Sequence, residues 1–145
     1  MNRESICYCG LYCENCAVKV KVEPASQILY KEMKKAGFED IIHAMPDGDR
    51  FWSFLKGMAV QGVCVSCRGG NGGNPRCAVR ICAKGKNVEI CALCERYPCE
   101  LFAGFFEGYP ILRHDNSVLR EKGMDAWAKL QDERHSRGFT YADEK

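Results

Sequence analysis

The stretch CAVRICAKGKNVEICALCERYPC, residues 77–99, holds five of the eleven cysteines of this 145-residue chain. Within it, Cys91 and Cys94 form a CxxC pair, which places two thiolates on one tight turn where they can chelate a single ion. Cys82 precedes this pair and Cys99 follows it, so one short segment offers the four ligands that zinc prefers. The sequence therefore predicts a local tetrathiolate metal site made of these four cysteines.

A second metal site is predicted from two further CxxC pairs. Cys13 and Cys16 form one pair, and Cys64 and Cys67 form the other. If both pairs bind one ion, the ends of the segment between them are held together and that segment becomes an insert. Each zinc site of this kind contributes roughly 10 kcal/mol or more to folding. We therefore expect two zinc ions.

Three cysteines stand outside these two sets. Cys9 and Cys77 are left as alternative ligands or free thiols, and either could replace one of the chosen ligands. A reactive pair of thiols, or a cysteine nucleophile at one of these two positions, is a further hypothesis. Cys7 is expected to be a bystander.

Disulfides explain the cysteines less well than metal does. The chain begins MNRESI, with charge and no apolar signal stretch, whereas disulfides are typical of oxidising compartments. The cysteine count is also odd. We therefore expect a reduced protein in the cytoplasm.

An iron–sulfur redox or sensor protein is the alternative to zinc. Cys9, Cys13 and Cys16 have the CxxxCxxC spacing with which radical S-adenosylmethionine enzymes hold a [4Fe–4S] cluster. Those enzymes need a full or partial barrel of about 200 residues or more, which exceeds this chain. The spacing therefore leaves a simpler iron–sulfur protein as the competing hypothesis.

Charge and hydropathy limit the partners. The formal net charge is +2, and two tetrathiolate zinc sites would add eight negative and four positive charges, giving −2. No apolar run approaches the ~20 residues that span a bilayer, so no membrane partner is expected. The basic run from Arg68 to Lys86 contains no aromatic residue that could stack on a base. We expect nucleic-acid binding no tighter than about micromolar at physiological salt.

Catalytic signals are sparse. His43, His114 and His135 have no identifiable acid or base partner in the sequence. Zinc held by four thiolates also has no open coordination position for water. An interaction or regulatory module with an unknown protein partner is therefore favoured over an enzyme.

Helices are predicted between and after the cysteine blocks. Apolar residues recur at helical spacing over residues 29–36, 38–45 and 51–58, and aromatic stripes such as Phe51 and Phe54 are expected in the core. Another helix should begin with Asn74 as N-cap and Pro75 at its first position.

The last two helices are predicted from Pro98 onward. A helix starting at Pro98 would hold Cys99 in its first turn, where backbone amides favour a thiolate. The tail from Asp115 to Arg137 aligns Leu119 and Trp127 on one face, with a soft spot or break at Gly123.

The expected fold class is mainly α with short irregular or hairpin metal knuckles, in one small cysteine-rich, metal-stabilised domain. No alternating strand pattern is present to suggest a sheet. Residues 1–145 are expected to form that single domain, with a first knuckle (1–22), a helical insert (23–60), a second cysteine block (61–107) and a C-terminal helical tail (108–145).

Four stretches carry a resemblance to a known family: YCGLYCENC (8–16), CVSC (64–67), the opening stretch (77–99) and GMDAWAKLQDERHSRGFTYAD (123–143). They resemble the cysteine-rich proteins of bacteria and archaea called domain of unknown function 3795. The resemblance spans nearly the whole chain and implies zinc binding, without a reaction, substrate or partner. The family pattern matches every cysteine except Cys7. Some members end in further cysteines, whereas this chain ends YADEK, so no third knuckle is expected.

Overall fold

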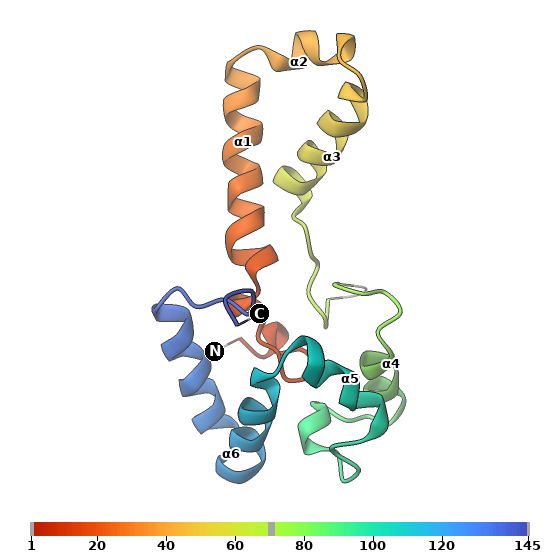
Figure 1. Ribbon diagram of the computed structural model, residues 1–145, viewed down its shortest axis with the longest axis vertical. Helices are drawn as coiled ribbons and strands as arrows, with labels where there is room; N and C mark the ends of the chain where they lie inside the picture. The colour runs from red at the N-terminus through yellow and green to blue at the C-terminus, as the bar shows by residue number, and fades with distance from the viewer. Residues whose placement is uncertain (1, 70–71, 145) are drawn as a thin grey trace. The chain divides into compact units, whose positions relative to one another are not determined.

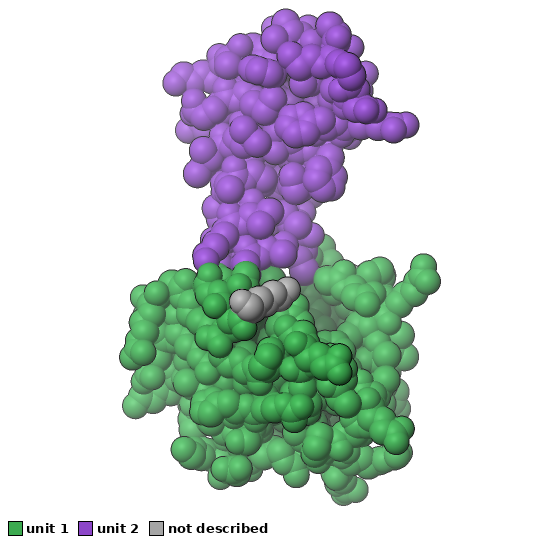
Figure 2. Space-filling view, in the orientation of Figure 1, with its two compact units in different colours: residues 1–16, 65–145 green, residues 17–64 purple. Residues whose placement is uncertain are grey.

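The computed structural model describes residues 2–69 and 72–144, which divide into two compact units (Figures 1 and 2). Unit 1 comprises Met1–Cys16 and Val65–Lys145, and unit 2 comprises Ala17–Cys64. The described residues contain six α-helices and no strand, with one isolated antiparallel bridge between Ile6 and Tyr12. The prediction of a mainly helical fold is confirmed, and the insert predicted over 23–60 lies inside unit 2.

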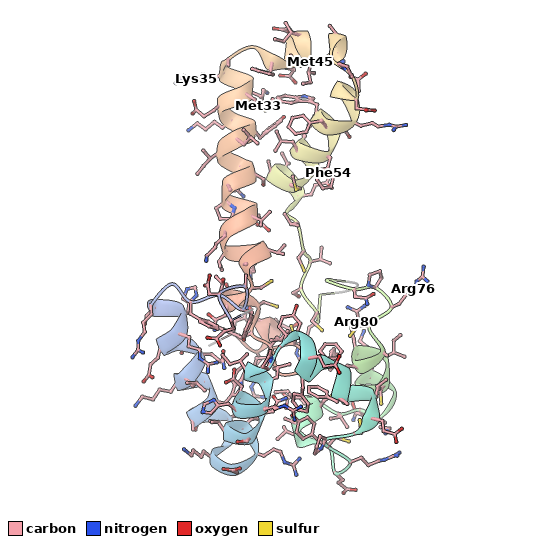
Figure 3. All side chains as sticks on the ribbon, in the orientation of Figure 1. Met33, Lys35, Met45, Phe54, Arg76 and Arg80 are labelled. Atoms are coloured by element: carbon pink, nitrogen blue, oxygen red, sulfur yellow. The ribbon has the colours of Figure 1, made fainter. Side chains whose placement is uncertain are left out.

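Unit 2 is built from consecutive helices. Its elements are a π-helical turn (Val18–Val22), α1 (Glu23–Lys35), α2 (Phe38–Ile41), a 3-10 turn (Ile42–Ala44) and α3 (Gly48–Gln61). Gly37 has φ 77° and separates α1 from α2, since this left-handed conformation ends a helix. Ile42, Trp52 and Leu55 form the buried core, against which side chains of α1 such as Met33 pack (Figure 3).

The predicted core stripe of α3 is partly wrong. Phe51 is 44% exposed and Phe54 is 67% exposed, whereas Trp52 and Leu55 are buried. Neighbouring residues on a helix point about 100° apart, so a face containing Trp52 and Leu55 turns both phenylalanines outward. Leu55 and Met58 of the predicted stripe do pack in the core.

Unit 1 combines short helices with irregular segments. Its elements are 3-10 turns at Arg3–Ser5, Cys13–Asn15 and Cys91–Leu93, together with α4 (Ala78–Gly85), α5 (Glu100–Gly108) and α6 (Ile111–Ser136). Two apolar clusters lie in its interior. One contains Ile6, Tyr12, Ile90, Ala92, Leu119 and Trp127, and the other contains Cys9, Val79, Phe102, Phe106 and Leu112. Both clusters join the first residues of the chain to the second cysteine block and α6.

A buried polar network also ties the first residues of the chain to α6. Asp115 is fully buried and accepts hydrogen bonds from Gln131 Nε2 at 2.9 Å and from Arg134 at 2.6 Å. The Gln131 side-chain oxygen in turn accepts from Asn15 Nδ2 at 3.0 Å and from the Tyr141 hydroxyl at 3.2 Å. Because a buried polar group is costly without a partner, this network fixes the packing of these segments.

The start of α4 differs from the prediction. The helix begins at Ala78 with Cys77 as N-cap, three residues after Pro75. The Asn74 side chain instead accepts the backbone N–H of Arg76 at 2.9 Å, in a turn before the helix. The Arg80 guanidinium donates to the carbonyls of residues 72, 74 and 75, so a contact from inside the helix holds this segment as a loop.

The start of α5 also differs, and the break in α6 is confirmed. Cys99 is the extended N-cap of α5 (φ −116°, ψ 166°), and not a residue of its first turn as predicted from Pro98. In α6, Gly123 has non-helical φ 81° and ψ 178°. Neither α6 nor any other helix in the described ranges is long and apolar enough to cross a membrane.

Candidate metal centre

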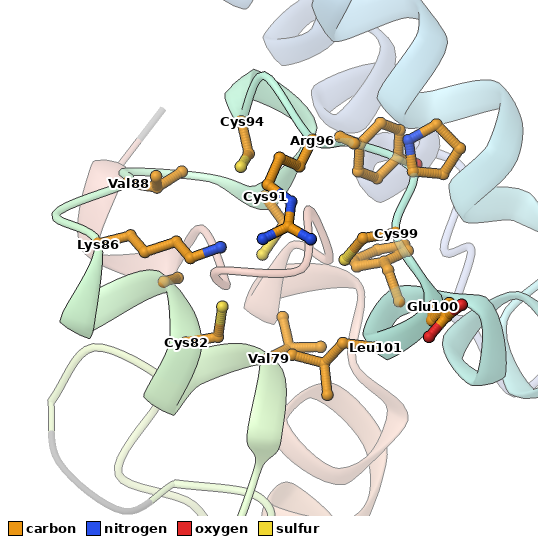
Figure 4. A pocket seen from close by; sticks show the side chains of 14 residues that line it. Val79, Cys82, Lys86, Val88, Cys91, Cys94, Arg96, Cys99, Glu100 and Leu101 are labelled. Atoms are coloured by element: carbon orange, nitrogen blue, oxygen red, sulfur yellow. The ribbon is translucent and has the colours of Figure 1, made fainter.

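Four cysteines of the second block surround one cavity of about 580 Å³ (Figure 4). Cys82 comes from α4, Cys91 and Cys94 from the two ends of a 3-10 turn, and Cys99 from the N-cap of α5. The structure thus brings together the four cysteines that the sequence groups as one set. Apolar side chains, including Val79 and Phe102, form part of the cavity wall.

The CxxC pairs Cys91/Cys94 and Cys13/Cys16 share one backbone conformation. The backbone N–H of Cys94 donates to the carbonyl of Cys91 at 3.0 Å, and the N–H of Cys16 donates to the carbonyl of Cys13 at 3.0 Å. Each pair therefore closes a single 3-10 turn with a cysteine at its start and at its cap. This is the tight turn that the spacing predicts.

The cavity disfavours a thiolate that has no cation beside it. Burial, followed by the charges of neighbouring thiolates with Cys9 first, raises the pKa of Cys91 to about 12. Two cationic side chains, Lys86 and Arg96, line the same cavity and are directed toward the cysteines (Figure 4). A metal ion that displaces the thiol protons would relieve this repulsion directly.

A second group of thiols gathers around Cys7. Its Sγ lies 3.7 Å from Cys13 Sγ, and its thiol also interacts with those of Cys67 and Cys9. The hydrogen bond with Cys13, followed by those with the other two thiols and by burial, raises the pKa of Cys7. We call Cys7, Cys9, Cys13 and Cys67 the Cys7 cluster.

The surroundings of Cys67 favour its thiolate form. Its pKa falls to about 6 because the Cys7 thiol donates a hydrogen bond to it, although burial opposes the change. The backbone N–H of Tyr8 and the charge of Arg80 also contribute to this lowered pKa. Arg80 is only 3% exposed, so its charge acts inside the protein.

The Cys7 cluster divides the cysteines differently from the predicted first site. Cys13 and Cys67 belong to it, as expected for ligands of one site. The charge of Cys16 acts on Tyr109, as do the charges of Cys9 and Cys7. Cys64 is the last residue of unit 2. The role of these two cysteines as ligands stays a prediction.

The predicted bystander, Cys7, lies at the centre of the cluster. The chain reverses after it: the N–H of Cys7 donates to the carbonyl of Leu11 at 2.8 Å, and Gly10 takes φ 94°. This reversal allows Cys7 to approach Cys13. The glycine after Cys9 and the CxC spacing of Cys7 and Cys9 were the signals in the sequence that could have revealed it.

The alternative positions lie in the interior of unit 1. Cys9 is 6% exposed, and the Asn116 side chain donates to its carbonyl at 3.2 Å. Cys77 caps α4 and packs against the apolar cluster that contains Cys9. Among residues 2–69 and 72–144, no three His, Cys, Asp or Glu side chains are positioned to hold a metal ion as they stand. The donors available in both groups are thiols, which suit zinc and iron–sulfur clusters.

A family model described as "Protein of unknown function (DUF3795)" matches residues 5–104, a range that includes all eleven cysteines. The stretch 123–143, which contributes to the resemblance seen in the sequence, lies beyond the matched range. No match was found among curated proteins or among solved structures. Since the match covers well over half of its residues, the chain belongs to the DUF3795 family.

Proposed function

We propose that the protein binds zinc through cysteine thiolates and that the zinc stabilises the fold of unit 1. The observation that carries the proposal is the cavity into which Cys82, Cys91, Cys94 and Cys99 converge from separate elements. Four thiolates provide a complete tetrahedral set for one zinc ion. Zinc bound there would cross-link α4, the 3-10 turn and α5.

The surroundings of the cavity suit the charge of such a site. Zinc with four thiolates carries a net charge of about −2, and outer residues that donate to sulfur stabilise it. Lys86 and Arg96 supply positive charge at the cavity, and the backbone amides at the start of α5 lie beside Cys99. These groups are suited to balancing the thiolates.

A structural role follows from the number of ligands. Four protein thiolates leave zinc no open position at which water could bind and be activated. We therefore propose an interaction or regulatory module with a protein partner in preference to a hydrolase.

Two arginines of the basic run support the expectation of weak nucleic-acid binding. Arg68 donates to the backbone carbonyls of Ile6 and Glu89, both at 2.7 Å. Arg80 donates to three backbone carbonyls of the preceding loop. Donors used in this way support the fold of unit 1 and are not offered to phosphates.

The proposal is tested by metal analysis of the full chain, purified anaerobically with zinc in the growth medium. We expect a colourless, zinc-loaded protein, and we expect Cys82→Ser combined with Cys99→Ser to lose about one zinc per chain. Cys77→Ser is the matched control, because Cys77 lies on the same segment but does not line the cavity. A brown protein with iron and broad visible absorption would favour the iron–sulfur alternative. A reduced protein that is folded without metal would refute metal binding altogether.

A further inference from the structure

We propose that Cys7, Cys9, Cys13 and Cys67 bind a second zinc ion within unit 1. This inference rests on the proposed zinc chemistry but assigns a different site from the cavity. It also differs from the site predicted by CxxC spacing, because Cys7 and Cys9 take the places of Cys16 and Cys64. All four proposed ligands belong to unit 1.

The separation of two sulfurs is compatible with a single shared ion. Cys7 Sγ and Cys13 Sγ are 3.7 Å apart. A tetrahedral zinc site with bonds of ~2.3 Å has sulfur–sulfur edges of about 3.8 Å, so these thiols already stand at the required spacing. A disulfide would need them at ~2.05 Å. Cysteines on a [4Fe–4S] cluster bind separate irons and are held well apart, so the spacing does not suit that cluster.

Cys7 links the other three thiols into one group. Its thiol interacts with those of Cys13, Cys67 and Cys9, and the side chain packs against the interior apolar cluster. As they stand, no three His, Cys, Asp or Glu side chains in the described residues are arranged around a common point. The proposed site therefore requires the cysteine side chains to rotate between staggered rotamers so that the four sulfurs meet on one ion.

An arginine side chain holds the two ends of the Cys7 cluster together. Arg68, next to Cys67, donates through Nε to the carbonyl of Ile6, next to Cys7, at 2.7 Å. Its guanidinium also lies 4.5 Å from the ring centroid of Tyr8. Thus one arginine fastens the segment containing Cys67 to the segment containing Cys7, which are distant in sequence.

The surroundings of Cys67 suit a metal-bound thiolate. The backbone N–H of Tyr8 donates to its sulfur, and the buried Arg80 guanidinium supplies a positive charge beside it. Hydrogen bonds and cations of this kind accompany thiolate ligands in metal sites because they offset the negative charge on sulfur. The hydrogen bond from Tyr8 and the charge of Arg80 are the reason for choosing Cys67 as the ligand from the pair Cys64/Cys67.

The test is zinc stoichiometry by native mass spectrometry on single-cysteine variants of the full chain. We expect two zinc ions in the unmodified protein, one in Cys7→Ser and one in Cys9→Ser, but two in Cys64→Ser. Cys64→Ser is the matched control because it breaks a CxxC pair without removing a proposed ligand. The cavity variant, Cys82→Ser with Cys99→Ser, should separately lose the other zinc, so failure of either site can be recognised on its own.

A measurement on the unmodified protein covers the case in which Cys7→Ser does not fold. Zinc-loaded protein is alkylated under mild conditions and mapped by mass spectrometry. Zinc-bound thiolates react slowly, so Cys7, Cys9, Cys13 and Cys67 should be protected, whereas Cys16 and Cys64 should be labelled.

Three results would overturn this assignment. One is loss of a zinc ion from Cys64→Ser while Cys7→Ser keeps two, because this would restore the ligand set predicted from spacing. Labelling of Cys7 in the zinc-loaded protein is another. The third is a Cys7–Cys13 disulfide in protein that holds only the cavity zinc, since this would identify a redox pair.

Discussion

The two units of this protein reach a folded state by different means. Unit 2 forms consecutive helices around the buried side chains of Ile42, Trp52 and Leu55. Unit 1 holds ten of the eleven cysteines, and two of its segments are short turns with a cysteine at the start and at the cap. Apolar packing of neighbouring helices accounts for unit 2, whereas we propose that unit 1 also needs cross-links through its thiols. This difference can be tested by measuring the stability of each unit separately.

The largest expected effect is that of zinc removal. Each structural zinc contributes roughly 10 kcal/mol to folding, more than most small domains have in total. A chelator with reductant should therefore unfold unit 1 and leave unit 2 helical. The chain provides one tryptophan in each unit: Trp127 in unit 1, fully buried, and Trp52 in unit 2, 8% exposed. Trp52→Phe and Trp127→Phe each leave a single fluorescent reporter.

On chelation, the emission of Trp127 should shift to longer wavelength while that of Trp52 stays unchanged. Zinc added back should restore the Trp127 signal. Loss of both signals together would show that the units are not independently stable, and an unchanged Trp127 signal would show that unit 1 does not need metal.

A smaller effect is expected from two charge pairs, one buried in unit 1 and one exposed in unit 2. Asp115 is fully buried and accepts from Arg134 at 2.6 Å, whereas the Lys34–Glu39 pair, at 3.5 Å, is about half exposed. Asp115→Ala leaves a largely buried guanidinium and the Gln131 amide without their acceptor, so it should cost about 3–5 kcal/mol. Lys34→Ala should cost about 0.5 kcal/mol or less, because solvent screens an exposed pair.

Denaturant unfolding, followed through the tryptophan of the same unit, measures both changes in free energy. Similar costs for the two variants would contradict the contrast between the units. A small cost for Asp115→Ala would show that water reaches Arg134 when the carboxylate is removed.

A further comparison uses two glycines with positive φ. Gly10 in unit 1 has φ 94°, and a Cβ there would lie 2.1 Å from Asn116 Oδ1, whereas Gly37 in unit 2 has φ 77° and open space. Gly10→Ala combines backbone strain with overpacking and should cost about 3 kcal/mol. Gly37→Ala meets only the left-handed backbone penalty, about 1 kcal/mol.

The free energies of unfolding of these two variants are measured in the same way as for the charge pairs. If Gly10→Ala costs no more than Gly37→Ala, the Asn116 side chain can move aside. That outcome would also weaken the case for a fixed chain reversal between Cys7 and Cys13.

Local patterns predicted the helical content and the turns at two of the CxxC pairs, Cys13/Cys16 and Cys91/Cys94. Such features depend on neighbouring residues, and so does the break at Gly123, where the sequence expectation is confirmed. The grouping of Cys82 with Cys99 around one cavity could also be predicted, because a short stretch of chain holds both. The binding of an ion in this cavity, and the identity of that ion, stay proposals.

Features that depend on side-chain and packing contacts outside the local pattern could not be predicted. The start of α4 depends on Arg80, which holds the preceding loop by three carbonyl contacts that no local pattern reveals. The sequence did not determine which face of α3 is buried, because Phe51 and Trp52 are both apolar. Only packing within unit 2 places Trp52 in the core. The position of Cys7 depends on a chain reversal and on Arg68, more than sixty residues away.

The smallest expected effect is an alkaline destabilisation that involves Tyr141 of unit 1. Burial raises the pKa of Tyr141 above the ordinary value of 10.0, and the charge of Asp115 contributes in the same direction. A group whose folded pKa is raised holds its proton longer in the folded state than in the unfolded state. Its contribution is therefore fully present below about pH 10 and is lost as pH rises toward the folded pKa, at about 1.4 kcal/mol per pH unit.

The unfolding free energy followed through Trp127 should accordingly fall by about 1 kcal/mol between about pH 10 and pH 11. Tyr141→Phe is the control. It should lose about 1 kcal/mol at neutral pH, because the hydroxyl accepts the N–H of Tyr12 at 2.8 Å and donates to Gln131 at 3.2 Å. Its stability should then fall less steeply above pH 10, since the ionising group is gone. Identical slopes in the two proteins would show that other groups cause the alkaline loss, and that the hydroxyl of Tyr141 ionises as freely in the folded state as in the unfolded chain.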